Sequence, residues 1–260
     1  MRRLVGLVPA AGHGKRVAFL PCSKELFPIG FTHVVAQGKF EVKPQAVGEY
    51  ILERMRIAGV EHVFIILSRG KWDIMNYFGD GSKFGLQIAY LFQENVWGMP
   101  YALDLARPWL RDETVLFGMP DTIFYPEDAF SKLLIAHQSL SADVTLGLFP
   151  TTTPERFGMV EFDNESLRAF KIIDKPGKTN LKYMWGIGCW GPVFTEFLHT
   201  QLQTLSPPSK EIVLGDIFQL AIEADLKVRV LPFEEGEFID IGEPDELVRA
   251  IKRFADPITC

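Results

Sequence analysis

A glycine-containing loop directly after the first apolar run is the feature that most constrains the fold of this chain. Residues 4–8 read Leu-Val-Gly-Leu-Val, and residues 9–16 continue as Pro-Ala-Ala-Gly-His-Gly-Lys-Arg. Glycines allow backbone N–H groups to approach an anion closely, and the basic side chains of Lys15, Arg16 and the later Lys24 would neutralise its charge. The pattern predicts a phosphate-binding loop at the carboxyl end of a buried strand.

This loop differs from the two best-known nucleotide-binding loops. A P-loop requires glycine at position 9 and Ser or Thr at position 16, where this chain has Pro9 and Arg16. A dinucleotide-binding loop requires a third glycine, where this chain has Val17, and an acidic residue after the second strand. The second apolar run, residues 63–67, is followed instead by Ser68. The sequence therefore argues against a P-loop protein and against a nicotinamide-dependent enzyme.

Apolar runs of strand length alternate with helix-length segments through the first 150 residues. We expect strands at 4–8, 63–67, 87–92, 114–117 and 143–149, and helices at 44–58, 71–78, 98–106 and 127–137. This alternation is typical of an α/β fold with a mostly parallel sheet and helices on both faces. Ligands of such sheets bind beyond the carboxyl ends of the strands, where both the glycine loop and Asp121 fall.

The rhythm changes after residue 150. We expect strands at 158–162, 167–173, 183–190, 227–231 and 238–242, and helices at 193–198, at 212–224 and from Pro244 onward. The first two strands would pair antiparallel around the Asp163-Asn164 turn. Residues 30–42 form an additional piece, expected to be a β-hairpin that turns at Gly38-Lys39. We expect a single domain over 1–260, with a nucleotide-binding part over about 1–150 and a substrate-side part over about 151–260.

Composition narrows the ligand class and the compartment. The chain has 260 residues, a net charge of −6 and no basic block, which argues against a nucleic-acid surface. It has no 18-residue apolar run, so no membrane span is expected. The three cysteines are widely spaced, as in proteins of a reducing compartment, and neither they nor the histidines show metal-ligand spacing. A cytoplasmic location is therefore expected.

The loop is part of a longer pattern. Pro-Ala-Ala-Gly-x-Gly-x-Arg at 9–16 is followed by Pro-x-x-Lys-Glu-Leu-x-Pro-Ile at 21–29. This pattern resembles the opening of the sugar-nucleotide pyrophosphorylases, notably the glucose-1-phosphate thymidylyl- and uridylyltransferases. The resemblance covers most of the chain. It implies a Rossmann-like, GT-A-like fold, in which a mostly parallel sheet flanked by helices carries a small antiparallel sugar-binding subregion.

The resemblance assigns the phosphate-binding roles to two cations and to the loop. Arg16 would hold the triphosphate and stabilise the departing pyrophosphate, and Lys24 would bridge the phosphates at the reacting centre. Without the surrounding motif, both would be read as solvated surface cations. The further nucleotide contacts that the resemblance implies are Ala10, Ala11, Gly12, Gly14, Lys15, Gln93 and Gly98.

Two aspartates are the candidate metal ligands. Asp121 and Asp240 each follow an apolar strand, and Mg²⁺ takes one or two carboxylates, with its remaining ligands from water and phosphate. The resemblance makes them the two Mg²⁺ ligands of the family, although Pro120 stands where the family has glycine. The alternative is a pair of turn or helix-cap aspartates.

The base would be recognised at the end of the strand expected over 87–92. The Gln93 amide can satisfy both a donor and an acceptor on a uracil edge, and Gly98 follows it closely. Trp97 and Pro100 depart from the family pattern here, which leaves the identity of the base open. The alternative for Gln93 is an exposed strand-end amide.

By the same resemblance, the sugar-phosphate-binding residues are Gly158, Glu161, Lys175 and Trp185. Glu161 closes a segment similar to the family's Tyr-Gly-Val-Val-Glu, whose Glu accepts hydrogen bonds from sugar hydroxyls. Lys175 lies in Asp-Lys-Pro, which is similar to Glu-Lys-Pro, whose Lys pairs with the sugar phosphate. Trp185 stands where relatives often carry Thr or Ala, so the sugar is open too. The alternative for these charged residues is a set of surface salt bridges.

The prediction is a Mg²⁺-dependent nucleotidyltransferase that joins a sugar 1-phosphate, expected to be glucose 1-phosphate, to dTTP or UTP. One alternative is a related transferase for GTP or CTP and for a mannose or heptose phosphate. Another is a catalytically silent regulatory domain that binds a nucleotide-sugar, although the reacting-centre cations and both aspartates argue against it. The expected partners are the two substrates, without nucleic acid or membrane, and a homo-oligomer is compatible with the resemblance.

Overall fold

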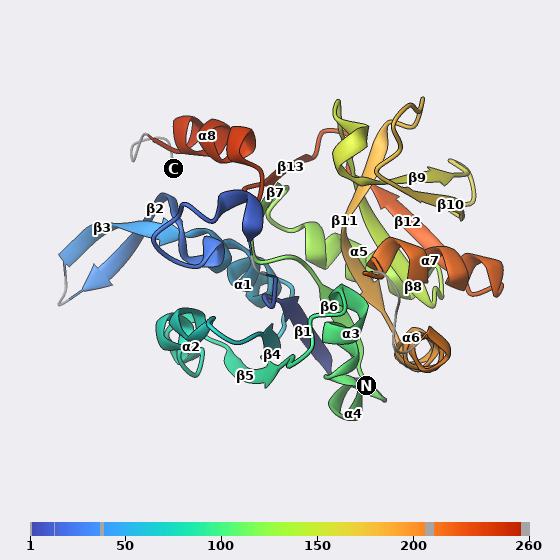
Figure 1. Ribbon diagram of the computed structural model, residues 1–260, viewed down its shortest axis with the longest axis horizontal. Helices are drawn as coiled ribbons and strands as arrows, with labels where there is room; N and C mark the ends of the chain where they lie inside the picture. The colour runs from blue at the N-terminus through green and yellow to red at the C-terminus, as the bar shows by residue number, and fades with distance from the viewer. Residues whose placement is uncertain (1, 13, 37–38, 206–210, 256–260) are drawn as a thin grey trace.

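A nine-stranded sheet runs through the molecule (Figure 1). The computed structural model describes residues 2–12, 14–36, 39–205 and 211–255. The strands of the sheet are β1 (Leu4–Pro9), β4 (His62–Leu67), β5 (Gln87–Phe92), β6 (Thr114–Phe117), β8 (Val144–Pro150), β9 (Gly158–Phe162), β10 (Ala169–Asp174), β11 (Tyr183–Trp190) and β12 (Val228–Pro232). Their order is β10-β9-β11-β6-β1-β4-β5, and β8 pairs with both β11 and β12.

The sheet is parallel in its first part and antiparallel in much of its second. Strands β6, β1, β4 and β5 run parallel to one another. Strand β11 lies antiparallel to β6, β8 and β9, and β9 lies antiparallel to β10. The predicted α/β fold, with a mostly parallel sheet and a small antiparallel subregion, is confirmed. The prediction of a single domain stays a prediction.

Helices cover both faces of the sheet, as expected. They are α1 (Val47–Ile57), α2 (Trp72–Phe78), α3 (Met99–Asp104), α4 (Arg107–Leu110), α5 (Ala129–Ser139), α6 (Pro192–Leu205), α7 (Leu214–Glu223) and α8 (Pro244–Arg253). Side chains of α1, α2 and α5 pack on one face, and those of α3, α4, α6 and α7 pack on the other. Because side chains alternate along a strand, the neighbours Leu7 and Val8 of β1 belong to opposite cores. This explains why β1 is apolar throughout.

Two small sheets stand apart from the large one. Strand β2 (Pro28–Ala36) pairs antiparallel with β3 (Lys39–Ala46), which confirms the predicted hairpin, although Gly38 of its predicted turn lies outside the described residues. Strand β7 (Thr122–Tyr125) pairs antiparallel with β13 (Glu237–Asp240). The sequence analysis missed β7, since four residues directly after a strand give too short a pattern.

Several helix boundaries differ from the prediction. Pro44 lies in β3 opposite Phe31, and α1 begins only at Val47, so the predicted helix start at Pro44 is wrong. Both strands of a two-stranded sheet are edge strands, and an edge strand tolerates proline as well as the first turn of a helix does. The segment 98–106 is helical only to Asp104, and a second short helix, α4, follows. Helix α6 continues past residue 198 because its apolar stripe continues with the buried Leu202.

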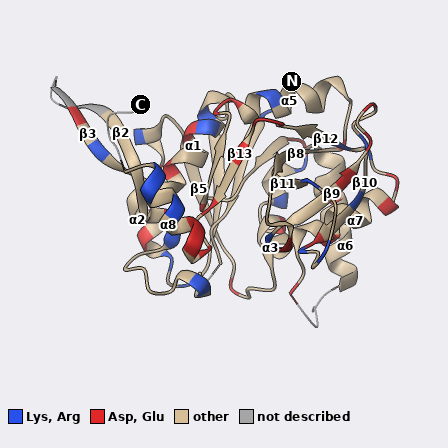
Figure 2. Ribbon diagram, turned by 90° about the horizontal axis from the view of Figure 1, so that it is seen from above, with Lys and Arg blue, Asp and Glu red and all other residues tan. Residues whose placement is uncertain are grey.

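The last described helix packs against elements from the first half of the chain. Helix α8 lies near β2 (Figure 1), and its Leu247 packs in a small core with Val47 of α1, Ile123 of β7 and Ile239 of β13. Basic and acidic residues are interspersed along the elements seen in Figure 2. Among the described helices, none has the length and apolar character needed to cross a membrane.

Arg54 ties α1 to β7. It is only 2% exposed, and its Nε donates to the Phe124 carbonyl at 2.9 Å while its Nη1 donates to the Tyr50 carbonyl at 3.1 Å. Its guanidinium also lies 5.0 Å from the centre of the Phe124 ring and 5.2 Å from that of the Tyr125 ring. Within the part of the chain that the structure describes, this buried cation is therefore held by carbonyls and aromatic faces rather than by a carboxylate.

We predict that Arg54→Met lowers the free energy of unfolding by about 2 kcal/mol or more, because the buried Phe124 carbonyl loses its donor. Urea denaturation measures this loss. Arg56→Met, at an exposed position of the same helix, is the control and should change stability by less than about 0.5 kcal/mol. Equal losses in the two variants would contradict the role given to Arg54.

Candidate active site

Lys24 and Asp121 form an ion pair at the carboxyl edge of the parallel strands. Lys24 begins the short 3₁₀ turn η2 (Lys24–Leu26), and Asp121 lies between β6 and β7. Their side chains are 16% and 11% exposed, and the ammonium donates to Asp121 Oδ2. Burial alone lowers the pKa of Lys24, but the Asp121 carboxylate outweighs it and the pKa is raised. Burial likewise raises the pKa of Asp121, yet Lys24 holds it below its usual value.

Asp240 reaches the same point from the end of β13, where it pairs with Thr122 of β7. A Cβ on Gly242 would lie 2.9 Å from Asp240 Oδ1, 3.2 Å from Asp121 Oδ2 and 3.6 Å from Lys24 Nζ. The glycine therefore leaves room where the three groups converge. Burial and the neighbouring Asp121 carboxylate raise the pKa of Asp240 to about 6. Two carboxylates around such a space fit the donor set that Mg²⁺ prefers.

Arg16 lies at the rim of this site. It belongs to the 3₁₀ turn η1 (Lys15–Val17), more than half of its side chain is exposed, and its guanidinium pairs with Glu243. Glu243 is the residue directly before α8. The sequence analysis missed this carboxylate, whose only signal was its position shortly after Asp240. In the described structure the predicted triphosphate-binding cation is thus neutralised by a neighbour.

The glycines form the open part of the loop. Gly14 has φ +59°, a left-handed conformation that favours glycine, and a Cβ on Gly12 would meet nothing within 4 Å. Ala10 and Ala11 are buried, and the Ala10 N–H is donated to the Ile66 carbonyl at 2.8 Å, so it is not free to bind an anion. The parts of the loop that the structure leaves undescribed are His13 and the side chain of Lys15.

A cavity of about 270 Å³ lies between the glycine loop and the antiparallel part of the sheet. Five of the predicted site residues line it: Arg16, Gly158, Lys175, Trp185 and Asp240. They come from positions far apart in the chain. The structure therefore joins the predicted sugar-phosphate side to the predicted phosphate and metal side.

Two features of this cavity are unusual for a purely structural region. Lys175 has φ +45°, which is rare for a residue with a side chain, and its N–H donates to the Phe157 carbonyl at 2.9 Å. Trp185 packs directly against Gly158, and its indole N–H is buried with no hydrogen-bond partner among the described residues. The strained backbone of Lys175 and the unsatisfied indole N–H of Trp185 thus occur at residues that line the same cavity.

Glu161 does not line the cavity. It is exposed on β9 and lies opposite Lys171 of β10. Asp174, at the end of β10, and Arg156 both line the cavity. The sequence analysis did not select these two residues; the signal for Asp174 was its position directly before Lys175.

Gln93 and Gly98, the two residues predicted to contact the base, lie in contact with each other. The Gln93 amide is buried and donates to the Gly98 carbonyl at 3.3 Å. Gly98 has φ +119°, and a Cβ there would collide with the backbone carbonyl of Ile212, a residue that also lines the cavity. Only glycine fits this position without strain.

A second hollow, of about 300 Å³, lies beside the glycine loop. Lys24, Arg69 and Lys71 line it together with Gly14 and Ser23. Each of these three basic side chains is already paired with a carboxylate: Lys24 with Asp121, Arg69 with Glu94 and Lys71 with Glu25.

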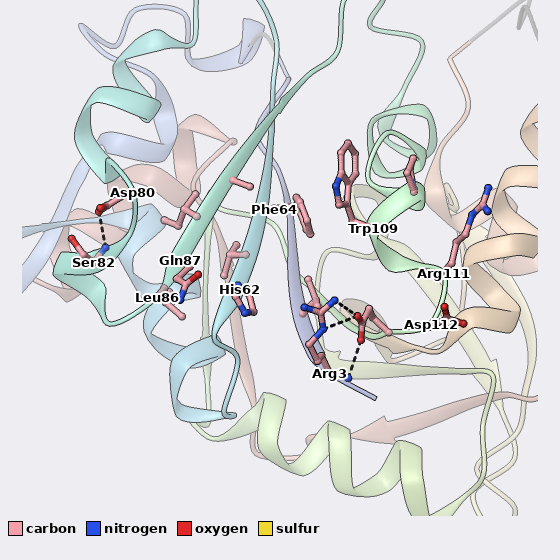
Figure 3. Close-up of a pocket in the computed structure, with 16 residues that line it drawn as sticks. Arg3, His62, Phe64, Asp80, Ser82, Leu86, Gln87, Trp109, Arg111 and Asp112 are labelled. Carbon is pink, nitrogen blue, oxygen red and sulfur yellow. Dashed lines mark hydrogen bonds and ion pairs between the residues drawn. The ribbon is translucent and has the colours of Figure 1, made fainter. Parts of the chain in front are cut away.

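A larger cavity, of about 810 Å³, lies at the opposite edge of the sheet (Figure 3). It is lined by residues near the amino ends of β1, β4 and β5, among them His62 and Phe64, with Trp109 on its wall. Its Arg3 is held by Glu113 at 2.6 Å. None of the predicted site residues lines it, so we place the candidate active site at the carboxyl edge.

The chain is similar to known nucleotidyltransferases. The low-salt glycan biosynthesis nucleotidyltransferase of Haloferax volcanii is 26% identical over 223 residues, covering 84% of this chain and 60% of that protein's length. The glucose-1-phosphate thymidylyltransferase of Neisseria meningitidis is 26% identical over 230 residues, covering 87% of this chain and 74% of that protein.

Likeness to a solved structure concerns the fold alone. A Bacillus anthracis protein described as a glucose-1-phosphate thymidylyltransferase, in complex with sucrose, superposes with a TM-score of 0.82 at 19% identity, covering 97% of this chain and 96% of that one. The model of the nucleotidyl transferase family matches residues 7–256, which include both the glycine loop and the aspartate pair. The chain belongs to the nucleotidyl transferase family.

Proposed function

We propose that this chain joins a sugar 1-phosphate to a nucleoside triphosphate and releases pyrophosphate. The observation that carries the proposal is the convergence of Lys24, Asp121 and Asp240 on one point, beside a cavity lined by Arg16 and Lys175. Two anionic substrates repel each other, so cations on both sides of the reacting centre are what such a transfer requires.

In the proposed reaction, an oxygen of the sugar phosphate attacks the α-phosphorus of the triphosphate. The bond from the α-phosphorus to its bridging oxygen breaks, and pyrophosphate leaves with the electron pair. The nucleophile is already anionic, so no general base is needed. Lys175 would hold the sugar phosphate, Lys24 would neutralise charge at the reacting phosphates, and Arg16 would exchange Glu243 for the triphosphate.

Asp121 and Asp240 would hold Mg²⁺, which when bound supplies positive charge to the phosphate oxygens. The room left by Gly242 between the two carboxylates supports this assignment. Among the described residues no group of three or more His, Cys, Asp or Glu side chains could hold a metal, so its other ligands would be water and phosphate.

The proposed substrates are dTTP or UTP and glucose 1-phosphate. The name of the Neisseria relative supports a pyrimidine nucleotide. Trp185 and Lys175 line one cavity, which supports a sugar phosphate there. The cytoplasmic location, the absence of nucleic-acid binding and a homo-oligomeric state stay predictions.

The first test is a screen for pyrophosphate release, with Mg²⁺, over the common nucleoside triphosphates and several sugar 1-phosphates. We expect release with dTTP or UTP and glucose 1-phosphate, and loss of release with a chelator. Asp121→Asn should lower kcat about 100-fold or more, because the reacting centre loses a charge. Asp128→Asn, at an exposed position beside α5, is the control and should leave kcat unchanged. Full activity in Asp121→Asn would refute the proposed site.

The ion pair between Arg16 and Glu243 predicts a substitution that improves substrate binding rather than impairing the reaction. Glu243→Gln should lower the KM for the triphosphate, because Arg16 no longer has to break an ion pair before it binds the substrate. The effect should be about two- to fivefold, because an exposed ion pair is weak. Steady-state kinetics at saturating sugar phosphate measures this. Asp245→Asn, at the neighbouring and almost fully exposed carboxylate, should leave the KM unchanged. A raised KM in Glu243→Gln would show that Glu243 supports binding instead.

The contact between Gly158 and Trp185 predicts a change on the sugar side alone. Gly158→Ala pushes the indole into the cavity, so the KM for the sugar phosphate should rise about tenfold or more while the KM for the triphosphate stays the same. Gly177→Ala is the matched control, since a Cβ there meets nothing within 4 Å. Equal effects on both KM values would argue against a sugar phosphate in this cavity.

A further inference from the structure

Three side chains that follow β4 fasten both ends of the loop that carries the glycines. We call Ser68, Lys71 and Asp73 together the 68–73 clasp. At the first end of the loop, the Ser68 hydroxyl donates to the Ala11 carbonyl at 2.7 Å. This bond fixes the backbone directly before the open glycines.

The other end of the loop is held by two residues of the clasp. Asp73 accepts hydrogen bonds from both the N–H and the hydroxyl of Ser23, each at 2.8 Å. The Lys71 ammonium donates to both oxygens of the Glu25 carboxylate, at 2.8 and 3.0 Å. The two residues that flank Lys24 in the chain are therefore both anchored to the same short segment.

The ion pair of Lys71 with Glu25 is deeply buried, at 8% and 1% exposure. Burial raises the pKa of Glu25, and the Lys71 ammonium counteracts that rise. A buried ion pair is poor evidence for stability, because an apolar pair of similar shape often does as well. A geometric role is the better explanation here, since the pair lies beside the proposed reacting centre.

The side chain of Lys24 leads away from the clasp toward that centre. Its Cδ lies 3.7 Å from where a Cβ on Gly14 would be, and its ammonium pairs with Asp121. Fixing Ser23 and Glu25 therefore fixes where the Lys24 ammonium lies relative to the open glycines and the aspartates.

We propose that the 68–73 clasp is a positioning device: it closes the loop from Ala11 to Ser23 at both ends and so sets the place of the Lys24 ammonium against the triphosphate. This inference rests on the role proposed above for Lys24. It concerns residues that do not touch the reacting atoms, so its signature is a change in kcat at unchanged stability. A misplacement of about 1 Å can cost about 100-fold in rate.

The test replaces the buried pair by two apolar side chains of similar length, in Glu25→Met/Lys71→Met. The matched control is Glu196→Gln/Arg107→Met, which removes the two-oxygen ion pair between α4 and α6, where Arg107 lies 2.6 Å from Glu196. Thermal unfolding, kcat and both KM values are measured for each. A second readout needs no substrate: the rate at which acetic anhydride labels Lys24, measured by peptide mass spectrometry, with the exposed Lys132 as the internal reference.

We expect the melting temperature of the clasp variant to stay near that of the unmodified protein, with kcat lowered about tenfold or more, KM values changed less than about threefold, and Lys24 labelled several times faster. The control should change none of the kinetic values. Asp73→Asn provides the same labelling measurement if the double variant does not fold.

Unchanged labelling of Lys24 in the clasp variants would overturn the inference, whatever the activity. Faster labelling in a protein that releases pyrophosphate with no substrate pair would support the clasp and refute the proposed function. Faster labelling with kcat unchanged would show that the clasp orders Lys24 without serving the reaction, which also overturns the inference.

Discussion

The close approach of two buried carboxylates, Asp121 and Asp240, is the constraint on which the site depends. Like charges in a place with little water repel strongly, and Lys24 pairs with only one of them, so the pKa of Asp240 is raised while that of Asp121 is lowered. The pairing of β7 with β13 holds the two groups together against this repulsion. A place of this kind favours a cation, which is why we propose Mg²⁺ binding at these two carboxylates.

Several parts of the molecule serve to keep these groups in place. Parallel strands bring the loops after β1 and β6 to one edge, and β11 extends the sheet so that the antiparallel part reaches the same edge. Arg54 ties β7 to α1, and α8 packs over β13. Carboxylates pair with Arg16 and Lys24, as with the buried Lys71. A phosphate bound by Arg16 or Lys24 would therefore replace an existing partner rather than meet a free cation.

Much of the fold could be derived from the sequence, and so could the chemical types of the candidate site residues. Periodicity distinguishes strands from helices, and an uninterrupted apolar run such as β1 indicates a strand buried on both faces. These signals are local, and they sufficed for the α/β alternation, for the hairpin and for the open glycine loop. Because strand ends attract ligands in such folds, the positions of Asp121 and Asp240 after apolar strands, together with the family resemblance, made them candidates.

The tertiary structure decided which of these residues meet and which partners they have. The four-residue strand β7 gave no signal of its own, yet its pairing brings Asp240 beside Asp121. Asp174 lines the cavity and Glu161 does not, because each strand shows alternate residues to opposite faces and its register sets which face that is. Glu243 and the 68–73 clasp act across tens or hundreds of residues of chain, and no local pattern encodes such contacts. The sequence by itself determined the local elements and the chemical types at the strand ends, since both depend on neighbours along the chain; strand register and burial, which depend on the whole fold, determined the geometry of the site.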